Sequence, residues 1–369
     1  KLDTKVDVLN TYIQLRDDSV YLNSGEFALR NARIFDREGH SGRISGALRH
    51  THLKNMTYGF DIQGDNLLMY NTNDPGDMLF YGKVYGTGNI ALTGGNNVMN
   101  IEANVTTGPN TTFTYVTGLP AEATNNQFIT FVDKSPRRIQ DSIRTEFYHY
   151  TDAVQKDEDD GPPMDLYINM FIDATPDATM KVVMDPVAGD NITARGSGNF
   201  QVSFYNKGDF RMFGNYIVDQ GMYKLSMKEI IHKDFALKSG STVTFTGDPY
   251  LANLDVQAVY TVNSASLSDL STDASLTHST VKVNCLMNLT GSLANPTIKF
   301  DLELPTVNEE DRELVRSATS TEEQMNTQII YLLGIGKFYA YDYNANSNRS
   351  SSATSSLAFS TLSGQLNNM

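Results

Sequence analysis

The chain has 369 residues, with 43 acidic side chains against 29 Lys and Arg, so its formal net charge is -14. This balance excludes nucleic-acid binding through a basic surface and electrostatic attachment to anionic lipid headgroups. The lone cysteine, Cys285, excludes an internal disulfide and is predicted to be a small buried hydrophobe in a strand. Apolar runs stop short of the roughly 18–20 residues that a membrane helix requires. We interpret the chain as a fragment whose signal or membrane anchor lies outside it.

Residues 1–132 are predicted to form a first β-groove segment. Apolar and polar residues alternate there, for example at Tyr58, Phe60 and Ile62, and a period of two is typical of strands with one apolar face. One strand-like stretch is interrupted by glycines, which predict a bend, a bulge or a close approach of two backbones. These glycines are Gly82, Gly86 and Gly88.

Residues 133–163 break the alternation. Prolines stand near both ends of this stretch, and an acidic run occupies 157–160. A polar, charged segment of this kind predicts a loop or insertion without chemistry of its own.

A second β-groove segment is predicted for residues 164–306. Turn-type sequences at 206–209, 219–221, 238–240 and 247–249 divide its middle, so we expect a run of hairpins that builds one sheet with one apolar face. About 20–25 strands in the whole chain, at ~4.8 Å each, would give a sheet on the order of 100 Å long. The residues predicted to line the apolar face are Leu166, Ile168, Met170, Phe200, Val202, Phe204, Phe210, Met212, Tyr223, Leu225, Met227, Phe235, Leu237, Val243, Phe245, Leu254, Val256, Tyr260, Ile298, Phe300 and Leu302.

Between residues 307 and 340 the period changes to that of an amphipathic helix. The sequence from Ser320 to Glu323 matches a capping box, and Gly334 is predicted to end the helix. Its apolar stripe consists of Met325, Ile329, Leu332 and Leu333. We expect this stripe to cover part or one end of the sheet and to protect an edge. A Ser- and Asn-rich tail follows at 341–369.

Templates for catalysis and metal binding are missing from the sequence. The histidines form no HExxH motif and no i,i+4 pair, and the chain has neither a GxSxG elbow nor a GxxxxGK[ST] loop. His50 and His52 would share one face of a strand, but without a carboxylate pattern they indicate an exposed pair. Calcium is disfavoured because no Asp-x-Asp pattern repeats. We therefore predict a protein that is not an enzyme and that holds no cofactor and no metal.

Four distinctive stretches occur in the second half of the chain. They are GDFRMFGNYIVDQGMYKLSM at 208–227, KDFALKSGSTVTFTGDPYLANLDVQAVYTV at 233–262, LTGSLANPTIKFDLELP at 289–305 and EEQMNTQIIYLLGIGKF at 322–338. In this order they resemble the C-terminal region of the TamB family, the translocation and assembly module proteins related to AsmA. The recognisable match covers about 164–340, and the cysteine-containing strand VKVNCLMNL resembles the Bacteroidetes type.

The resemblance implies a mainly all-β fold. An elongated, mostly antiparallel sheet would curl into an open hydrophobic groove, a β-taco, followed by the C-terminal amphipathic helix. It also implies a protein of the Gram-negative periplasm that bridges the inner and outer membranes. The inner-membrane anchor would lie outside this chain, and an outer-membrane barrel of the BamA/TamA type would be the docking partner. The implied function is movement of phospholipid between the membranes along the groove, with an older association with the assembly of outer-membrane proteins.

Elementary energetics agrees with a lipid groove. Each methylene exposed to water costs ~0.8 kcal/mol, so an acyl chain of ~16 carbons faces a penalty on the order of 10 kcal/mol unless every step offers an apolar surface. Two alternatives stay open. An assembly factor or holdase for outer-membrane proteins would pair a client strand at the sheet edge, and a structural β-solenoid would use the same side chains as its own core. A membrane-embedded barrel is disfavoured because polar turns come too often.

Overall fold

A computed structural model describes residues 2–6, 10–16, 18–73, 80–116, 164–186, 188–208, 210–227, 231–270 and 280–339. The predicted insertion at 133–163 and the predicted tail at 341–369 lie outside the described residues. Within the described part, eighteen strands join in a single sheet, which confirms the predicted fold class.

The strands follow one another in two groups. The first group is β1 (Leu2–Val6), β2 (Thr11–Leu15), β3 (Tyr21–Asn23), β4 (Glu26–Phe35), β5 (Ser41–Thr51), β6 (Lys54–Thr72), β7 (Phe80–Gly95), β8 (Val98–Thr107) and β9 (Thr112–Val116). The second group is β10 (Asp165–Ala174), β11 (Thr179–Asp185), β12 (Asp190–Tyr205), β13 (Phe210–Met227), β14 (Ile231–Leu237), β15 (Thr242–Gly247), β16 (Asn253–Ser266), β17 (Thr280–Ser292) and β18 (Asn295–Glu303).

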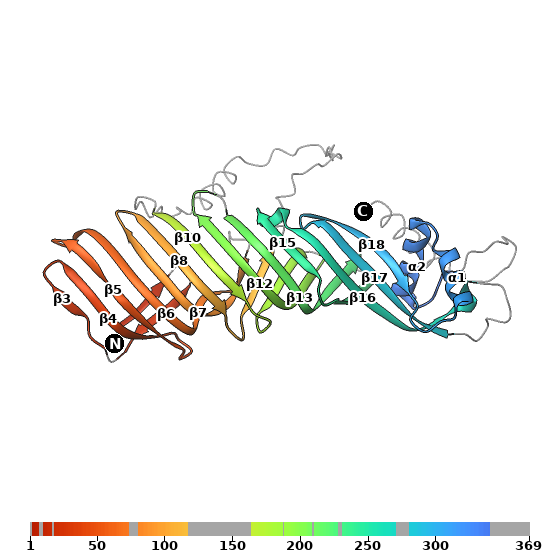
Figure 1. The fold of residues 1–369 in the computed structure, drawn as a ribbon, viewed down its shortest axis with the longest axis horizontal. Coiled ribbons are helices and arrows are strands. Elements are labelled where there is room, and N and C mark those ends of the chain that lie inside the picture. Colours follow the sequence, from red (N-terminus) through yellow and green to blue (C-terminus); the bar gives the residue numbers. More distant parts are fainter. Residues whose placement is uncertain are drawn as a thin grey trace, which may run out of the picture.

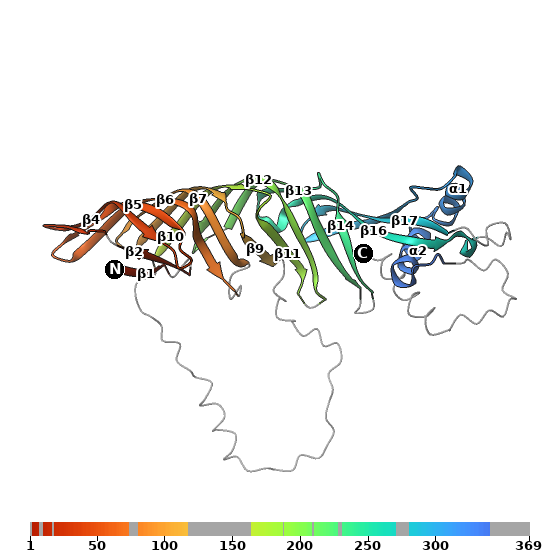
Figure 2. The ribbon, with the colours of Figure 1, turned by 90° about the horizontal axis from the view of Figure 1, so that it is seen from below.

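Long strands give the sheet two walls, because each is paired by two shorter strands placed end to end. β13 pairs with β15 over its first half and with β14 over its second half. β12 pairs with β11 over its first half and with β10 over its second half. We call the wall with β3, β5, β8, β10, β15, β17 and β18 the front wall, and the wall with β1, β2, β9, β11 and β14 the rear wall. The strands β4, β6, β7, β12, β13 and β16 take part in both. Figure 1 shows the front wall nearest the viewer, and Figure 2 shows the sheet from below.

The bend between the walls is built on bulges and glycines. The register shifts after Gly64 in β6 and after Arg195 in β12. Gly88 and Gly214 have φ values of 155° and 136°, and a Cβ at either position would lie 2.1 Å or 2.0 Å from a carbonyl oxygen of the next strand. A side chain therefore has no room at these positions, and the close backbone approach predicted for this group of glycines is confirmed at Gly88.

One of the four turns predicted for the central segment is wrong, and another is present but does not make the expected hairpin. Residues 206–208 do turn between β12 and β13, and residues 248–251 form a short 3-10 turn. Residues 219–221, however, lie inside β13, where the strand bulges as it passes from one wall to the other. Residues 238–240 do turn, and the N–H of Ser241 bonds the C=O of Lys238 at 3.2 Å. This turn joins β14 to β15, which run in the same direction along β13, so it does not make a hairpin. In a strongly curved sheet, glycine and small polar residues mark bulges as well as hairpins.

Most pairings are antiparallel, as predicted. The exceptions are β10 with β8 and β11 with β9, which are parallel. Since several strands lie on the rear wall, the strands do not add up to one long row. The front wall from β3 to β18 spans about 60 Å at ~4.8 Å per strand.

Two helices, rather than one continuous helix, close the described chain beside β16–β18 (Figure 1). They are α1 (Glu309–Ala318) and α2 (Glu322–Ile335). The capping box exists but is shifted by one residue, because Thr321 and Gln324 form it. Gly336, with φ 71°, ends α2 in place of Gly334. The left-handed conformation that favours glycine occurs at this later position.

Candidate functional site

The inner face of the front wall carries apolar side chains that lie in register from strand to strand. One row crosses from β4 to β13, each residue the Cα partner of the next. It consists of Ala32, Ile44, Ile62, Ile90, Ala103, Met170, Val202 and Met212. At ~4.8 Å per strand this row is about 35 Å long, and none of its members is charged.

A second row runs beside the first on the same face and pairs in the same way. It consists of Leu29, Gly46, Phe60, Leu92, Ile101, Ile168, Phe204 and Phe210. Two neighbouring uncharged rows make a continuous apolar surface, which we call the inner groove.

The structure places the residues predicted to line the apolar face on this inward side of the sheet. The buried ones are Leu166, Phe200, Val202, Tyr223, Leu225, Phe235, Leu237, Leu254 and Val256. The half-buried ones are Ile168, Met170, Phe204, Phe210, Met212, Val243, Phe245, Tyr260, Ile298, Phe300 and Leu302. The side chain of Met227 lies outside the described part. Intervening residues such as Asn169 and Gln201 are exposed on the outer face.

Both walls contribute to an apolar cavity of about 90 Å³ near the middle of the sheet. Phe200 of the front wall and Phe113 and Val182 of the rear wall line it. The Phe80 ring lies 5.9 Å from that of Phe113 and 5.8 Å from that of Phe210, centroid to centroid. The predicted residues that this cavity brings together are Phe200, Phe210, Met212, Leu237, Val243, Phe245, Leu254 and Val256.

The rear-wall side of this cavity was not assigned to the groove from the sequence. Its residues include Phe113, Tyr115, Met180, Val182 and Ile192. Alternation within β9 and β11 was the available signal, but alternation does not reveal that two short strands lie opposite the central ones.

Two polar groups are buried beside the cavity. The hydroxyls of Tyr115 and Tyr216 have no hydrogen-bond partner among the described residues. Burial raises the pKa of both tyrosines, that of Tyr216 to about 12. A neutral hydroxyl in this position can donate a hydrogen bond or accept one.

Helix α2 covers the C-terminal end of the groove. Ile329, Ile330 and Leu333 are fully buried and join the same core cluster as Leu289 of β17. This confirms that the helical stripe packs on one end of the sheet. The buried amide of Gln328 bonds both the N–H and the C=O of Tyr339, at 2.8 Å and 2.9 Å, and so fixes the segment after the helix. This end is therefore a closed core.

Cys285 lies on β17 inside this core. Its side chain is completely buried, and burial raises the pKa of its thiol to about 12. The prediction of a small buried hydrophobe is confirmed.

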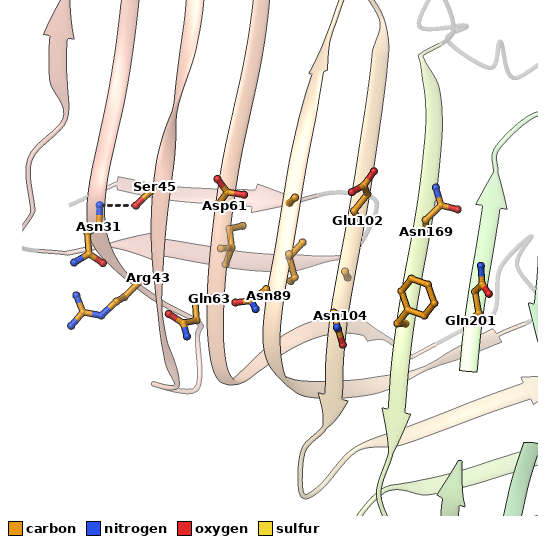
Figure 3. Close-up of a pocket in the computed structure, with 15 residues that line it drawn as sticks. Asn31, Arg43, Ser45, Asp61, Gln63, Asn89, Glu102, Asn104, Asn169 and Gln201 are labelled. Atoms are coloured by element: carbon orange, nitrogen blue, oxygen red, sulfur yellow. Dashed lines mark hydrogen bonds between the residues drawn. The ribbon is translucent and has the colours of Figure 1, made fainter. Parts of the chain in front are cut away.

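The outer face of the front wall is polar and hollowed. A depression of about 840 Å³ lies over β4–β12 (Figure 3). Its exposed side chains include Asp61, Asn89, Glu102 and Asn169. The inner and outer faces of one wall thus differ sharply in chemistry.

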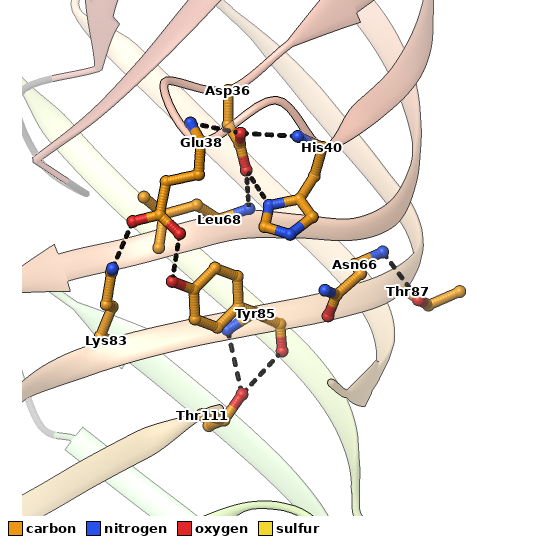
Figure 4. A network of polar contacts seen from close by, with 9 residues as sticks. All are labelled: Asp36, Glu38, His40, Asn66, Leu68, Lys83, Tyr85, Thr87 and Thr111. Atoms are coloured by element: carbon orange, nitrogen blue, oxygen red, sulfur yellow. Dashed lines mark hydrogen bonds and ion pairs between the residues drawn. The ribbon is translucent and has the colours of Figure 1, made fainter. Parts of the chain in front are cut away.

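A polar network ties the turn between β4 and β5 to the bend in β6 (Figure 4). The buried Asp36 carboxylate accepts hydrogen bonds from the backbone N–H groups of Glu38, His40 and Leu68, at 2.8, 2.9 and 3.0 Å, and contacts His40 Nδ1 at 2.8 Å. Burial would raise the pKa of Asp36, but the hydrogen bonds from His40 and Leu68 hold it below its ordinary value. The ionised carboxylate is therefore the form that the turn binds.

The network continues to β7 and to the start of β9. Glu38 accepts from the Tyr85 hydroxyl and pairs with Lys83, and the Thr111 hydroxyl bonds the backbone of Tyr85. These contacts lie at the bend and leave the inner groove apolar.

Within the described ranges, no group of His, Cys, Asp and Glu could hold a metal ion. His50 lies in β5 and is half-buried, whereas His52 lies in the turn that follows with φ 52° and is exposed, so the two do not share one face of a strand. The helices described in the structure are too short or too polar to cross a membrane.

Comparison with known proteins gives one match. The family model described as the TamB C-terminal domain matches residues 30–369. No curated protein and no solved structure matches the chain.

Proposed function

Because the chain belongs to the TamB family, a non-enzymatic transport and assembly module of the bacterial envelope, we propose that its inner groove conducts phospholipid between the inner and outer membranes. The observation that carries this proposal is the pair of uncharged, in-register rows on the inner face of the front wall. A surface of this kind lets an acyl chain move by small steps without entering water.

The energetics supports acyl chains as the cargo. At ~0.8 kcal/mol per methylene, a chain of ~16 carbons gains on the order of 10 kcal/mol from an apolar surface, and no one site has to supply all of it. The half-buried side chains Ile44, Phe60 and Leu92 leave part of the groove accessible in the N-terminal half. The phosphate headgroup stays in water at the rim, so a basic pocket is not needed.

The cellular setting follows from the family. The chain would lie in the periplasm of a Gram-negative bacterium, with its inner-membrane anchor outside this sequence, and it would dock on an outer-membrane barrel of the BamA/TamA type. Two membranes separated by water are the situation in which a long apolar surface is useful.

An assembly factor for outer-membrane proteins is the second candidate. The observation in its favour is β18, whose pairing in the described part of the chain is with β17 alone. An unpaired edge with half-buried Ile298, Phe300 and Leu302 can add a client strand.

A photocrosslinking residue at Phe204 tests both candidates. Phe204 is on the inner groove, and Gln201, exposed on the outer face of the same strand, is the matched control. We expect phospholipid adducts from Phe204 and none from Gln201, read by mass spectrometry. Adducts with unfolded barrel protein would support the assembly factor. Equal lipid labelling from both positions, together with native mass spectra free of phospholipid, would overturn the lipid groove.

A further inference from the structure

The outer face of the front wall carries an in-register row of its own, whose members alternate along each strand with the residues of the inner groove. Figure 3 shows most of this row. Successive members are Cα partners on adjacent strands from β5 to β12. The row consists of Arg43, Gln63, Asn89, Asn104, Phe171 and Gln201. It runs through the depression of about 840 Å³, and the small side chains of Ser45 and Ala91 lie beside it.

The amides of this row are free to bind a ligand. Gln63, Asn89, Asn104 and Gln201 make no side-chain hydrogen bond to the residues that the structure describes, and all are exposed. The outer face of β16–β18 differs. There Gln257 donates to Asn288 at 2.7 Å, and Asn284 donates to Glu303 at 3.0 Å. Polar side chains on neighbouring strands of this sheet can therefore hydrogen-bond to one another, but those of the row over the depression do not.

Aromatic rings extend the row at its central end. Phe171 is 56% exposed and Phe213 is 41% exposed. Phe171 and Phe213 are the Cα partners of Gln201 on its two neighbouring strands, so the rings lie two strands apart. Both rings line a further depression of about 380 Å³, which shares Phe171 and Gln201 with the first depression. The two rings therefore offer apolar area to a ligand within a surface that is otherwise polar.

The charge of the larger depression limits which chemical classes of ligand it can bind. The larger depression is lined by one cationic side chain, Arg43, and by two acidic ones, Asp61 and Glu102. Its surface therefore carries a slight negative charge. Phosphate-rich and sulfated ligands are therefore disfavoured, whereas neutral ligands that are rich in hydroxyl groups fit the amides.

We propose that this outer face binds a neutral, β-linked glycan strand laid across the β-strands. Side-chain amides both donate and accept, which suits the hydroxyl and acetamido groups of sugars. Aromatic faces carry partial negative charge and attract the C–H-rich face of a sugar ring. The strands repeat every ~4.8 Å, and an extended β-1,4-linked glycan advances by a similar distance per sugar. Rings two strands apart would then contact alternate sugars, which present the same face.

The test is a titration of the whole chain, freed of lipid, with chitohexaose and separately with cellohexaose. We expect saturable shifts of the side-chain NH2 resonances of Asn89, Asn104 and Gln201 with at least one of them. Phe171→Ala should weaken binding by roughly five- to tenfold, and Phe171→Trp should restore it. Ile217→Ala is the matched control, because Ile217 is 47% exposed on the same wall and does not line the depressions.

Three results would overturn the proposal. One is the absence of any shift with either sugar at millimolar concentration. Another is equal binding by Phe171→Ala and the parent chain, both folded by circular dichroism. The third is binding of an unstructured peptide at this face with no binding of either glycan.

Discussion

The two ends of the sheet use the same apolar pattern for different purposes. On β8, Ile101, Ala103 and Val105 keep 7–9% of their surface exposed, and Ile44, Ile90 and Leu92 toward β4 are half-buried. A small buried cluster lies beside them and consists of Leu15, Ala32, Ile34, Ile62 and Leu67. On β17, Met287 and Leu289 are completely buried, because α2 lies over that end. Both regions show the same alternation of apolar and polar residues. Whether the apolar face of a strand is a groove or a core depends on whether another element, such as α2, packs over it.

This difference teaches where the chain can tolerate change. Side chains of a closed core support folding through burial and packing. Side chains of an accessible groove contribute less to folding, and their apolar character is available to a ligand. Substitutions at equivalent positions of the two ends should therefore separate stability from function.

The largest expected contrast is between Leu289→Asp and Ile90→Asp. A carboxylate at the fully buried Leu289 costs several kcal/mol, which is a large part of the 5–15 kcal/mol that typically stabilises a fold. We expect this variant to lose cooperative unfolding, measured by circular dichroism on heating. Ile90 is half-buried, so Ile90→Asp should remain folded while its content of bound phospholipid falls.

Ile90→Ala serves as the control, because it removes volume without adding charge. If Ile90→Asp abolishes folding as completely as Leu289→Asp, the accessible character of the N-terminal half is refuted.

A smaller effect is expected at the glycines. Gly214 lies where the backbones of β12 and β13 approach closely, whereas a Cβ at Gly59 of β6 would have its nearest neighbour at 3.9 Å. Gly214→Ala should lower the free energy of unfolding by about 2 kcal/mol or more, because backbone must shift. Gly59→Ala should be neutral or stabilising by up to about 1 kcal/mol. Chemical denaturation measures both, and equal losses would show that the close approach of β12 and β13 does not require glycine.

The sequence predicts the sheet, the residues on its inward face and the helical segment that packs on one end of it. Period two placed Phe204, Met212 and Phe300 on the inward face, because a strand alternates strictly. It did not reveal the two walls. The bulge in β13, and the turn that joins β14 to β15 without reversing the chain, contain the same glycine and polar residues as a hairpin turn. Nor did it reveal the buried Asp36, because one of its hydrogen-bond donors, the N–H of Leu68, lies 32 residues further along the chain.

The Asp36 network should make the N-terminal end sensitive to acid. Its folded-state pKa lies below the ordinary value of 3.8, so its contribution is present above that value and is lost as pH falls through the folded pKa. At the other end burial raises the pKa of Asp269, although Lys337 opposes this, so acid does not weaken that end through this group. Hydrogen exchange should show loss of protection at Leu68 below about pH 4 before any loss at Leu289.

Asp36→Asn is the matched variant. It keeps the shape but loses acceptor capacity for the N–H of Leu68, so we expect a loss of about 1–3 kcal/mol at neutral pH and a flatter acid profile. An unchanged acid profile in Asp36→Asn would assign the acid response to other groups.

The smallest expected effect compares two tyrosine hydroxyls. Tyr85 donates to Glu38 at the N-terminal bend, whereas the Tyr216 hydroxyl is buried without a partner among the described residues. Tyr85→Phe should lower the free energy of unfolding by about 0.5–1.5 kcal/mol, and Tyr216→Phe should leave it unchanged or raise it by up to about 1 kcal/mol. Paired denaturation curves measure the difference, and a loss at Tyr216 as large as that at Tyr85 would mean that its hydroxyl is satisfied in solution. If Tyr216→Phe raises the free energy of unfolding and also retains less phospholipid, then the Tyr216 hydroxyl contributes to phospholipid binding and lowers the stability of the fold.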